Sequence, residues 1–120
     1  MHKISLKVDY QDERGQIIDL IVSDFDSVSR ITFTSGAVRG NHLHKETTQW
    51  AYVVSGNLEG YGGSQEELET LNLVQGDFIV SYPNEAHAFR ALEPSELLIF
   101  TKGPRSGKNY KEDTFIFKLI

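Results

Sequence analysis

The chain has 120 residues, of which 39% are hydrophobic and 11% aromatic, so it can build the core of one domain without disulfides or metals as staples. It has no cysteine, which excludes disulfide frameworks and thiolate metal sites and suits a reducing cytoplasm. The formal net charge is −5 without a basic stripe, so nucleic acid is not an expected partner, and no apolar run is long enough for a signal peptide or a membrane span. We therefore expect one soluble, cytoplasmic domain over residues 1–120.

Short apolar runs separated by turn signals are the main pattern along the chain. They are rich in Ile, Val, Thr, Phe and Tyr, which favour strands. The runs predicted as strands are Ile17–Val22, Arg30–Phe33, Trp50–Val54, Leu68–Val74, Phe78–Tyr82, Glu96–Phe100 and Thr114–Ile120. The stretch SQEELETL fits either a helical turn or a hairpin tip, and the polar residues 101–113 are expected to form a surface loop. This pattern predicts an all-β sandwich or barrel.

Histidines are the first sign of chemistry. His42 and His44 are two residues apart, so on a strand they would share one face. Gln49 precedes an alternating run, and His87 would share a face with Phe89. If these faces point into one barrel, three imidazoles and an amide oxygen converge, which suits a divalent metal such as Zn, Ni, Fe or Cu. The alternative is a pair of polar residues beside a turn.

The spacing of these residues resembles the first motif of the cupin family of small β-barrels. That motif reads Gly, five residues, His-X-His, three or four residues, Glu, six residues, Gly. The matching positions here are Gly36, His42, His44, Gln49 and Gly56, with glutamine where glutamate is usual. The resemblance implies a jelly-roll cupin barrel.

The second cupin motif is looser in this chain. Gly76 is followed by Tyr82-Pro83-Asn84 in place of Pro-X-Gly and then by His87, while the asparagine expected four residues later is Ala91. Asn84 can adopt the left-handed conformation that the family's glycine supplies.

The cupin resemblance also implies a metal site. It assigns His42, His44, Gln49 and His87 as ligands of a divalent ion, with Zn, Ni, Fe and Mn as the candidates. Glutamine in place of the carboxylate removes one negative charge, which should weaken the affinity for a hard dication. Small cupins of this kind often form homodimers, and the terminal runs, including Thr114–Ile120, are the expected contact surfaces.

A narrower resemblance, over about residues 12–56, is to cupins that modify nucleotide sugars, the sugar 3,4-ketoisomerases among them. Its matching positions are Asp12, Arg14, Gly15, Arg39, Gly40, His42, His44, Lys45 and Gln49. In those enzymes the histidines resemble acid–base groups, so Gln49 would be a hydrogen-bond partner instead of a ligand. Where they carry a pair of tyrosines, this chain has Thr32 and Phe33, so a phenol hydroxyl is lost there.

The resulting hypothesis is an isomerase or epimerase acting on a nucleotide sugar or uronate. His44 or His87 would move the proton, and Arg39 would pair with a phosphate or carboxylate unless it is a solvated rim charge. Tyr110 and Asp113 are candidates for closing the pocket mouth. The alternatives are a metal-dependent dioxygenase and a non-catalytic cupin that binds a small ligand. A polar pocket would favour a sugar, and an aromatic one would favour oxygenation.

Overall fold

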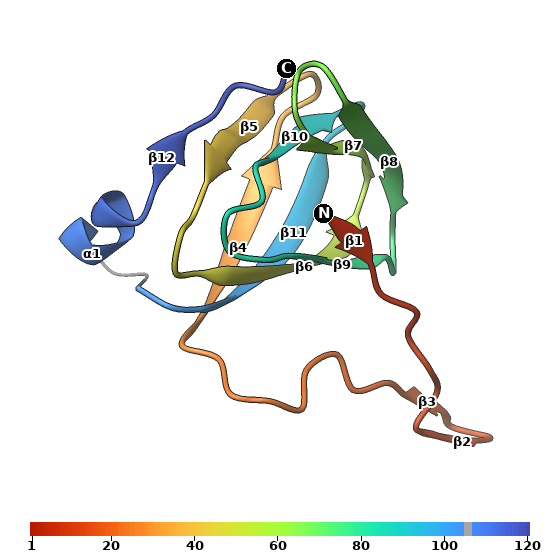
Figure 1. Cartoon of the computed structure of the whole chain (residues 1–120). Coiled ribbons are helices and arrows are strands. Elements are labelled where there is room, and N and C mark those ends of the chain that lie inside the picture. Colours follow the sequence, from red (N-terminus) through yellow and green to blue (C-terminus); the bar gives the residue numbers. More distant parts are fainter. Residues whose placement is uncertain (105–106) are drawn as a thin grey trace.

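Two antiparallel five-stranded sheets form the body of the molecule (Figure 1). The structure is a computed structural model and describes residues 1–104 and 107–120. In the first sheet the strand order is β1 (His2–Lys3), β9 (Phe78–Ser81), β6 (Thr48–Ser55), β11 (Ser95–Lys102) and β4 (Ser27–Phe33). In the second sheet it is β12 (Phe115–Ile116), β5 (Val38–Leu43), β10 (His87–Ala91), β7 (Asn57–Gly63) and β8 (Leu68–Val74). This arrangement confirms the all-β fold class.

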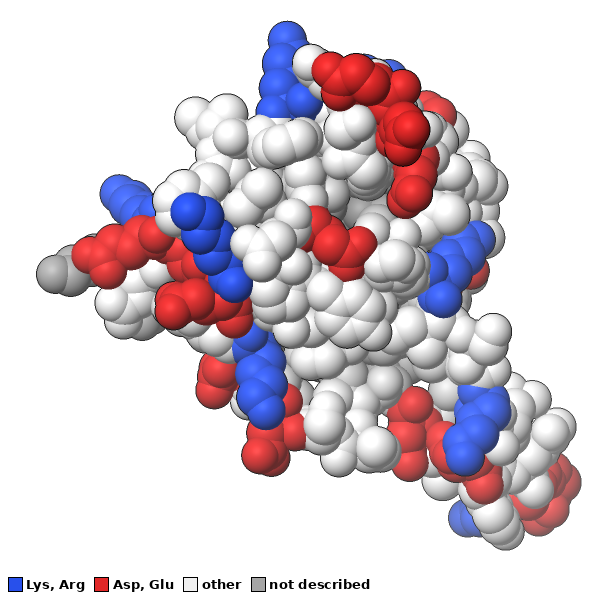
Figure 2. Space-filling view, viewed as in Figure 1, with Lys and Arg blue, Asp and Glu red and all other residues white. Residues whose placement is uncertain are grey.

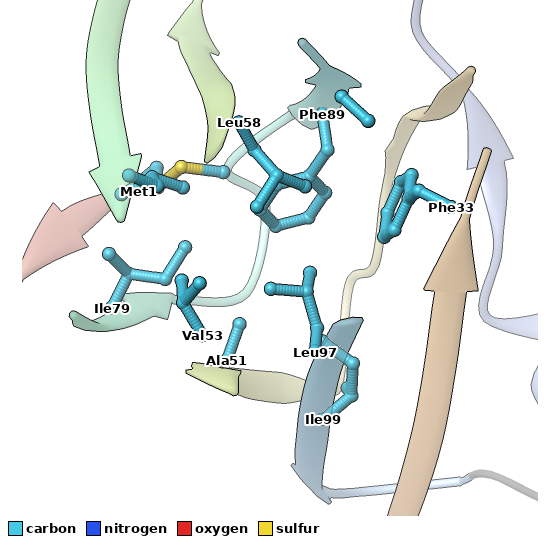
Figure 3. Close-up of a cluster of buried hydrophobic side chains, with 11 residues drawn as sticks. Met1, Phe33, Ala51, Val53, Leu58, Ile79, Phe89, Leu97 and Ile99 are labelled. Atoms are coloured by element: carbon cyan, nitrogen blue, oxygen red, sulfur yellow. The ribbon is translucent and has the colours of Figure 1, made fainter. Parts of the chain in front are cut away.

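The core lies between the two sheets and follows from strand alternation. In β11, Leu97 and Ile99 are buried while Leu98 and Phe100, which alternate with them, are only half-buried, because successive side chains point to opposite faces. Figure 3 shows this cluster, in which the Phe33 and Phe89 rings pack at a centroid distance of 6.3 Å. Its buried members are Met1, Phe33, Ala51, Val53, Leu58, Leu73, Ile79, Phe89, Ala91, Leu97 and Ile99.

Most predicted strands are present, but two apolar runs are largely not strands. The run Leu68–Val74 coincides with β8, whereas Ile17 is the single residue of Ile17–Val22 that lies in a strand. Of Thr114–Ile120, only Phe115 and Ile116 pair, with β5. Hydrophobicity alone does not make a strand, because the backbone N–H and C=O groups also need a neighbouring strand as partner.

The N-terminal arm explains the first of these differences. Residues 4–26 leave the barrel and carry a small hairpin of β2 (Tyr10–Asp12) and β3 (Gly15–Ile17), which projects away from both sheets (Figure 1). Val22 in this arm is 88% exposed, so the apolar run packs against little of its own chain.

The structure also tests the predictions for SQEELETL and for the loop at residues 101–113. The stretch SQEELETL contains the tip of the β7–β8 hairpin, where the Ser64 hydroxyl accepts a hydrogen bond from the Glu67 N–H at 3.1 Å. The predicted loop 101–113 is wrong in part, since residues Gly107–Glu112 form the short helix α1 and Thr101 and Lys102 end β11. Residues 105–106 of that prediction lie outside the described residues.

Charge is mixed on the face shown in Figure 2. Acidic and basic side chains are interspersed there without a continuous basic stripe. Within residues 1–104 and 107–120, no helix has the length and apolar character needed to cross a bilayer.

Candidate functional site

His42 and His87 meet because β5 and β10 are paired. The two residues are direct partners in the antiparallel register, and a bulge follows His87. Their ring centroids are 4.7 Å apart with the ring planes almost perpendicular. Irregularities of this kind often occur beside functional sites, where they can re-aim a side chain.

His44 completes a cluster of three imidazoles. It follows the last residue of β5, and its ring centroid lies 4.8 Å from that of His42 and 5.4 Å from that of His87. The ligand-capable nitrogens of the three residues all lie within 4.8 Å of one another. The prediction that His42 and His44 share a face is therefore confirmed, and His87 joins them.

Gly40 allows β5 and β10 to approach each other closely beside this cluster. A Cβ atom at Gly40 would lie 2.7 Å from the carbonyl oxygen of His87 and 2.9 Å from Cα of Ala88. Its φ of +95° also lies in a region that side chains disfavour. A residue with a side chain at this position would push His42 away from His87.

Three ring nitrogens in the cluster are buried without a hydrogen-bond partner among the described residues. They are Nε2 of His44 and both nitrogens of His87. His44 and His87 are only 3% and 2% exposed, so leaving these nitrogens unpaired costs free energy. A ligand in the middle of the cluster would satisfy Nε2 of His44 and one of the two nitrogens of His87.

One contact fixes the tautomer of His44, and burial sets the charge of His87. Nδ1 of His44 lies 2.9 Å from the main-chain oxygen of Asp113, and because that oxygen can only accept, the neutral imidazole carries its proton on Nδ1 and its lone pair on Nε2. Burial, reinforced by His42 and His44, lowers the pKa of His87 to about 3, so its imidazole is neutral at physiological pH.

The donor set fits a divalent cation after a small contraction. Neutral imidazole is the commonest protein ligand of Zn and related ions, at about 2.0–2.1 Å. Such bonds place the ligand nitrogens of one ion about 3–3.5 Å apart in tetrahedral or cis-octahedral geometry. The observed limit of 4.8 Å therefore requires the rings to move inward by roughly an ångström on loading.

A cavity of about 160 Å³ opens beside the cluster. Its polar wall contains His42, His87, Gln49, Arg39 and Tyr110. Its apolar wall contains Ile31, Phe33, Phe89, Leu97 and Ile99. Gln49 thus reaches the cavity as predicted, while His44 stands behind the wall with its unpaired nitrogen in the cluster.

Arg39 lies at the mouth of this cavity. It is exposed, donates a hydrogen bond to the Thr32 carbonyl oxygen at 3.3 Å, and holds its guanidinium 5.4 Å from the centre of the Phe33 ring. Arg39 and Phe33 also line an outer groove of about 550 Å³ with Thr32 and Pro94. The arginine therefore stands between a deep pocket and a shallower one.

Other predicted positions fall in different places. Asp12 and Arg14 pair with each other at 2.6 Å on the projecting hairpin, and neither lines the cavity of its own chain. This ion pair lowers the pKa of Asp12. Asn84 adopts a φ of +69°, as the second motif predicted, and its N–H donates to the His44 carbonyl oxygen at 2.6 Å.

The C-terminal segment contributes more than its sequence indicated. Tyr110 on α1 lines the cavity with its ring centre 5.7 Å from that of His44, and Asp113 bonds to His44 directly. They were predicted only as candidates for closing the mouth. No local motif marks either residue, because both reach the site through contacts between distant parts of the chain.

Comparison with known proteins identifies the family to which this fold is similar. The cupin domain family model matches residues 29–101, from within β4 to within β11. No curated protein sequence matches the chain significantly.

Solved structures share the fold at low identity. The sugar 3,4-ketoisomerase QdtA from Thermoanaerobacterium thermosaccharolyticum, solved with TDP, is 17% identical with a TM-score of 0.72, over 95% of this chain and 84% of that one. The RmlC epimerase of Mycobacterium tuberculosis is 15% identical with a TM-score of 0.75, over 95% and 66%. CapF of Staphylococcus aureus, a capsular polysaccharide assembling protein, is 18% identical with a TM-score of 0.70. The match to CapF covers 96% of this chain, which spans about a third (33%) of CapF.

With the family model covering more than half of its length and a jelly-roll of two facing sheets, the chain belongs to the cupin family.

Proposed function

We propose that this protein is a metal-dependent cupin enzyme that isomerises or epimerises a sugar carried on a nucleotide. The observation that carries the proposal is the cluster of three imidazoles beside a cavity, in which one ring nitrogen of each histidine lies within 4.8 Å of the others. Nε2 of His44 and both ring nitrogens of His87 are buried there without a hydrogen-bond partner among the described residues. Structural likeness to the sugar 3,4-ketoisomerase QdtA supports the sugar as substrate class, because the fold is shared.

In this proposal His42, His44 and His87 hold the ion, and Gln49 supplies an amide oxygen from the opposite sheet. A bound divalent metal would act as a Lewis acid on a carbonyl oxygen of the substrate. The cupin carboxylate is absent here, so the ion keeps more positive charge than it would beside glutamate. That favours polarisation of a neutral carbonyl at the expense of affinity for the ion.

The two pockets suggest how a nucleotide sugar would lie. The inner cavity of about 160 Å³ is smaller than the pockets of roughly 300–1,000 Å³ that enclose drug-sized ligands, so it suits a single ring. Arg39, at the boundary with the outer groove, is placed to pair with a phosphate through its guanidinium fork. The apolar wall would contact the carbon face of the sugar ring and exclude water.

The reaction needs a proton taken from a carbon beside the carbonyl and returned at a neighbouring position. With the metal present, the histidines serve as ligands and Tyr110 is the remaining titratable side chain that lines the inner cavity among the described residues, apart from Arg39. Without metal, His44 or His87 would move the proton itself. Elemental analysis separates these two forms of the proposal.

The test begins with protein purified without an affinity tag. We expect near-stoichiometric metal in the wild type and in His2→Ala, whose histidine is exposed on β1 outside the cluster, and none in His42→Ala. Proteins that bind metal are then incubated with a TDP-linked keto sugar in D₂O, where proton NMR should show deuterium entering beside the carbonyl. Absence of metal after reloading refutes the metal site, and absence of exchange refutes the isomerase.

A second candidate, a metal-dependent dioxygenase, is favoured by one observation. Half of the cavity wall is apolar, including Phe33 and Phe89, which suits a small apolar substrate. Iron in the purified protein together with oxygen consumption, and no exchange on keto sugars, would select this alternative.

We also propose a homodimer, with the N-terminal arm and β12 as contact surfaces. Tyr10, Ile17 and Val22 on the arm and Ile116 on β12 are exposed apolar side chains, and a two-stranded hairpin is marginal in water unless it packs against something. Light scattering after size-exclusion chromatography should give the mass of two chains. Substituting serine for Ile17 and Val22 should shift it toward one.

A further inference from the structure

We infer that Asp113 is a positioning residue of the histidine cluster. Its carboxylate binds the turn at residues 45–47, and this contact holds its main-chain oxygen against Nδ1 of His44, so that the Nε2 lone pair faces His42 and His87. The inference rests on the proposed metal site for its consequence, although the geometry that carries it does not contain the metal.

The carboxylate of Asp113 is buried, and both of its oxygens accept hydrogen bonds. Its side chain accepts hydrogen bonds from the backbone N–H groups of Lys45 and Glu46, both at 3.0 Å, and from the Thr47 hydroxyl at 2.7 Å. The residue is only 3% exposed, and a buried carboxylate is tolerated only with such donors around it. Asp113 therefore clamps the segment after α1 onto the turn that directly follows His44.

The main-chain oxygen of Asp113 can accept a hydrogen bond from His44 because helix α1 ends just before it, at Glu112. The Asp113 N–H still donates to the helix, to the carbonyl oxygens of Asn109 at 3.3 Å and Tyr110 at 3.2 Å. Carbonyl groups at a helix end have no partner within the helix, and this one accepts from Nδ1 of His44 at 2.9 Å. The orientation of the ring, and the nitrogen that it presents to the cluster, therefore depend on where Asp113 is held.

This arrangement couples the cluster to the C-terminal segment. A cation bound at Nε2 would polarise the imidazole and strengthen the bond from Nδ1 to Asp113, as carbonyl partners of metal-binding histidines generally do. By reciprocity, a metal that is held better when Asp113 is in place must itself stabilise that contact. The amides of Lys45 and Glu46, which donate to Asp113, should then exchange more slowly with solvent when metal is bound.

The experiment compares Asp113→Ala with Asp77→Ala, using Co²⁺ as the probe. Asp77 is a matched control, because its carboxylate also closes a turn, accepting from the Val74 N–H at 2.9 Å, but it touches no histidine. We expect Asp113→Ala to raise the Kd for Co²⁺ by about 10–100-fold and to change the visible spectrum of the bound ion. Asp77→Ala should lower the stability and leave both readouts unchanged, and Asp113→Asn, which keeps one acceptor oxygen, should fall between.

A metal-free readout keeps this inference separate from the metal proposal. Nitrogen-15 NMR of His44 should show the Nδ1-protonated tautomer in the wild type and a mixture in Asp113→Ala. If the wild type binds no Co²⁺ but shows this tautomer change, the metal function fails and the positioning role stands. If the folded Asp113→Ala protein keeps the wild-type tautomer, and the wild-type Kd where Co²⁺ binds, the inference is overturned.

Discussion

Replacing Gly40 by alanine would add one methyl group between β5 and β10, directly beside His42. The new Cβ would lie 2.7 Å from the His87 carbonyl oxygen and 2.9 Å from Cα of Ala88. Both are backbone atoms, so neither can rotate away. Gly36→Ala is the matched control, since Gly36 also has a positive φ, +82°, but has open space where the methyl group would go.

The size of the effect follows from these two environments. Forcing an L-residue into the positive-φ region costs about 1–2 kcal/mol, and this applies at both glycines. Overpacking a tight site costs about 1–3 kcal/mol more, and this applies at Gly40 alone. We therefore expect Gly40→Ala to lower the free energy of unfolding by about 2–5 kcal/mol and Gly36→Ala by about 1–2 kcal/mol.

The assay is urea unfolding of the metal-free proteins, followed by metal titration of each. A shift in midpoint at constant m-value reports stability alone. Because the methyl group separates His42 from His87, Gly40→Ala should also bind Co²⁺ more weakly than Gly36→Ala does. Equal unfolding free energies for the two variants would refute the close approach of β5 and β10 as the reason for glycine at this position.

Three further outcomes are expected. Gln49→Glu should restore the cupin carboxylate, lower the metal-free stability because a charge is placed at a half-buried position, and tighten the binding of a divalent ion measured by calorimetry. Gln65→Glu on the exposed hairpin tip should change neither the stability nor the binding. Because burial lowers the pKa of His87 to about 3, the unfolded chain takes up a proton below its ordinary pKa that the folded chain does not. Metal-free protein should therefore lose about 2 kcal/mol between pH 7 and pH 5 in urea unfolding, and His87→Gln should lack this component. Asn41→Ala removes the side-chain oxygen that accepts from the Leu119 N–H at 2.8 Å, so hydrogen exchange at residues 119–120 should rise.

The histidine cluster was predictable because its signals are local. A spacing of two residues on a strand puts His42 and His44 on one face whatever the rest of the chain does. His87 needed the second motif, since nothing in its own neighbourhood says that β10 pairs with β5. Glycine at position 40 was recognised as part of a motif, but its physical reason, contact with the His87 backbone, is visible only in the folded chain.

The parts that sequence reasoning missed depend on distant contacts. Residues 107–112 have no helical periodicity to detect. Asp113 was predicted only as a candidate for closing the pocket mouth, because its contact with His44 joins distant parts of the chain. The run Ile17–Val22 has strand composition, yet it lies on an arm where no neighbouring strand pairs with most of it. Composition indicates which side chains a segment could bury, whereas hydrogen bonding to a neighbouring strand decides whether the segment forms a strand.

The hydrogen bond between His44 and Asp113 joins residues that are 69 positions apart. Closing such a loop comes late, because the entropy of the intervening chain is lost before the contact forms. A metal that binds more tightly when this contact is formed gains little in the folding transition state, unlike an ion held by neighbouring ligands in a zinc finger. Metal binding should therefore leave the refolding rate almost unchanged and slow the unfolding rate. The ion would stabilise the folded barrel and would take no part in the nucleus from which the barrel folds.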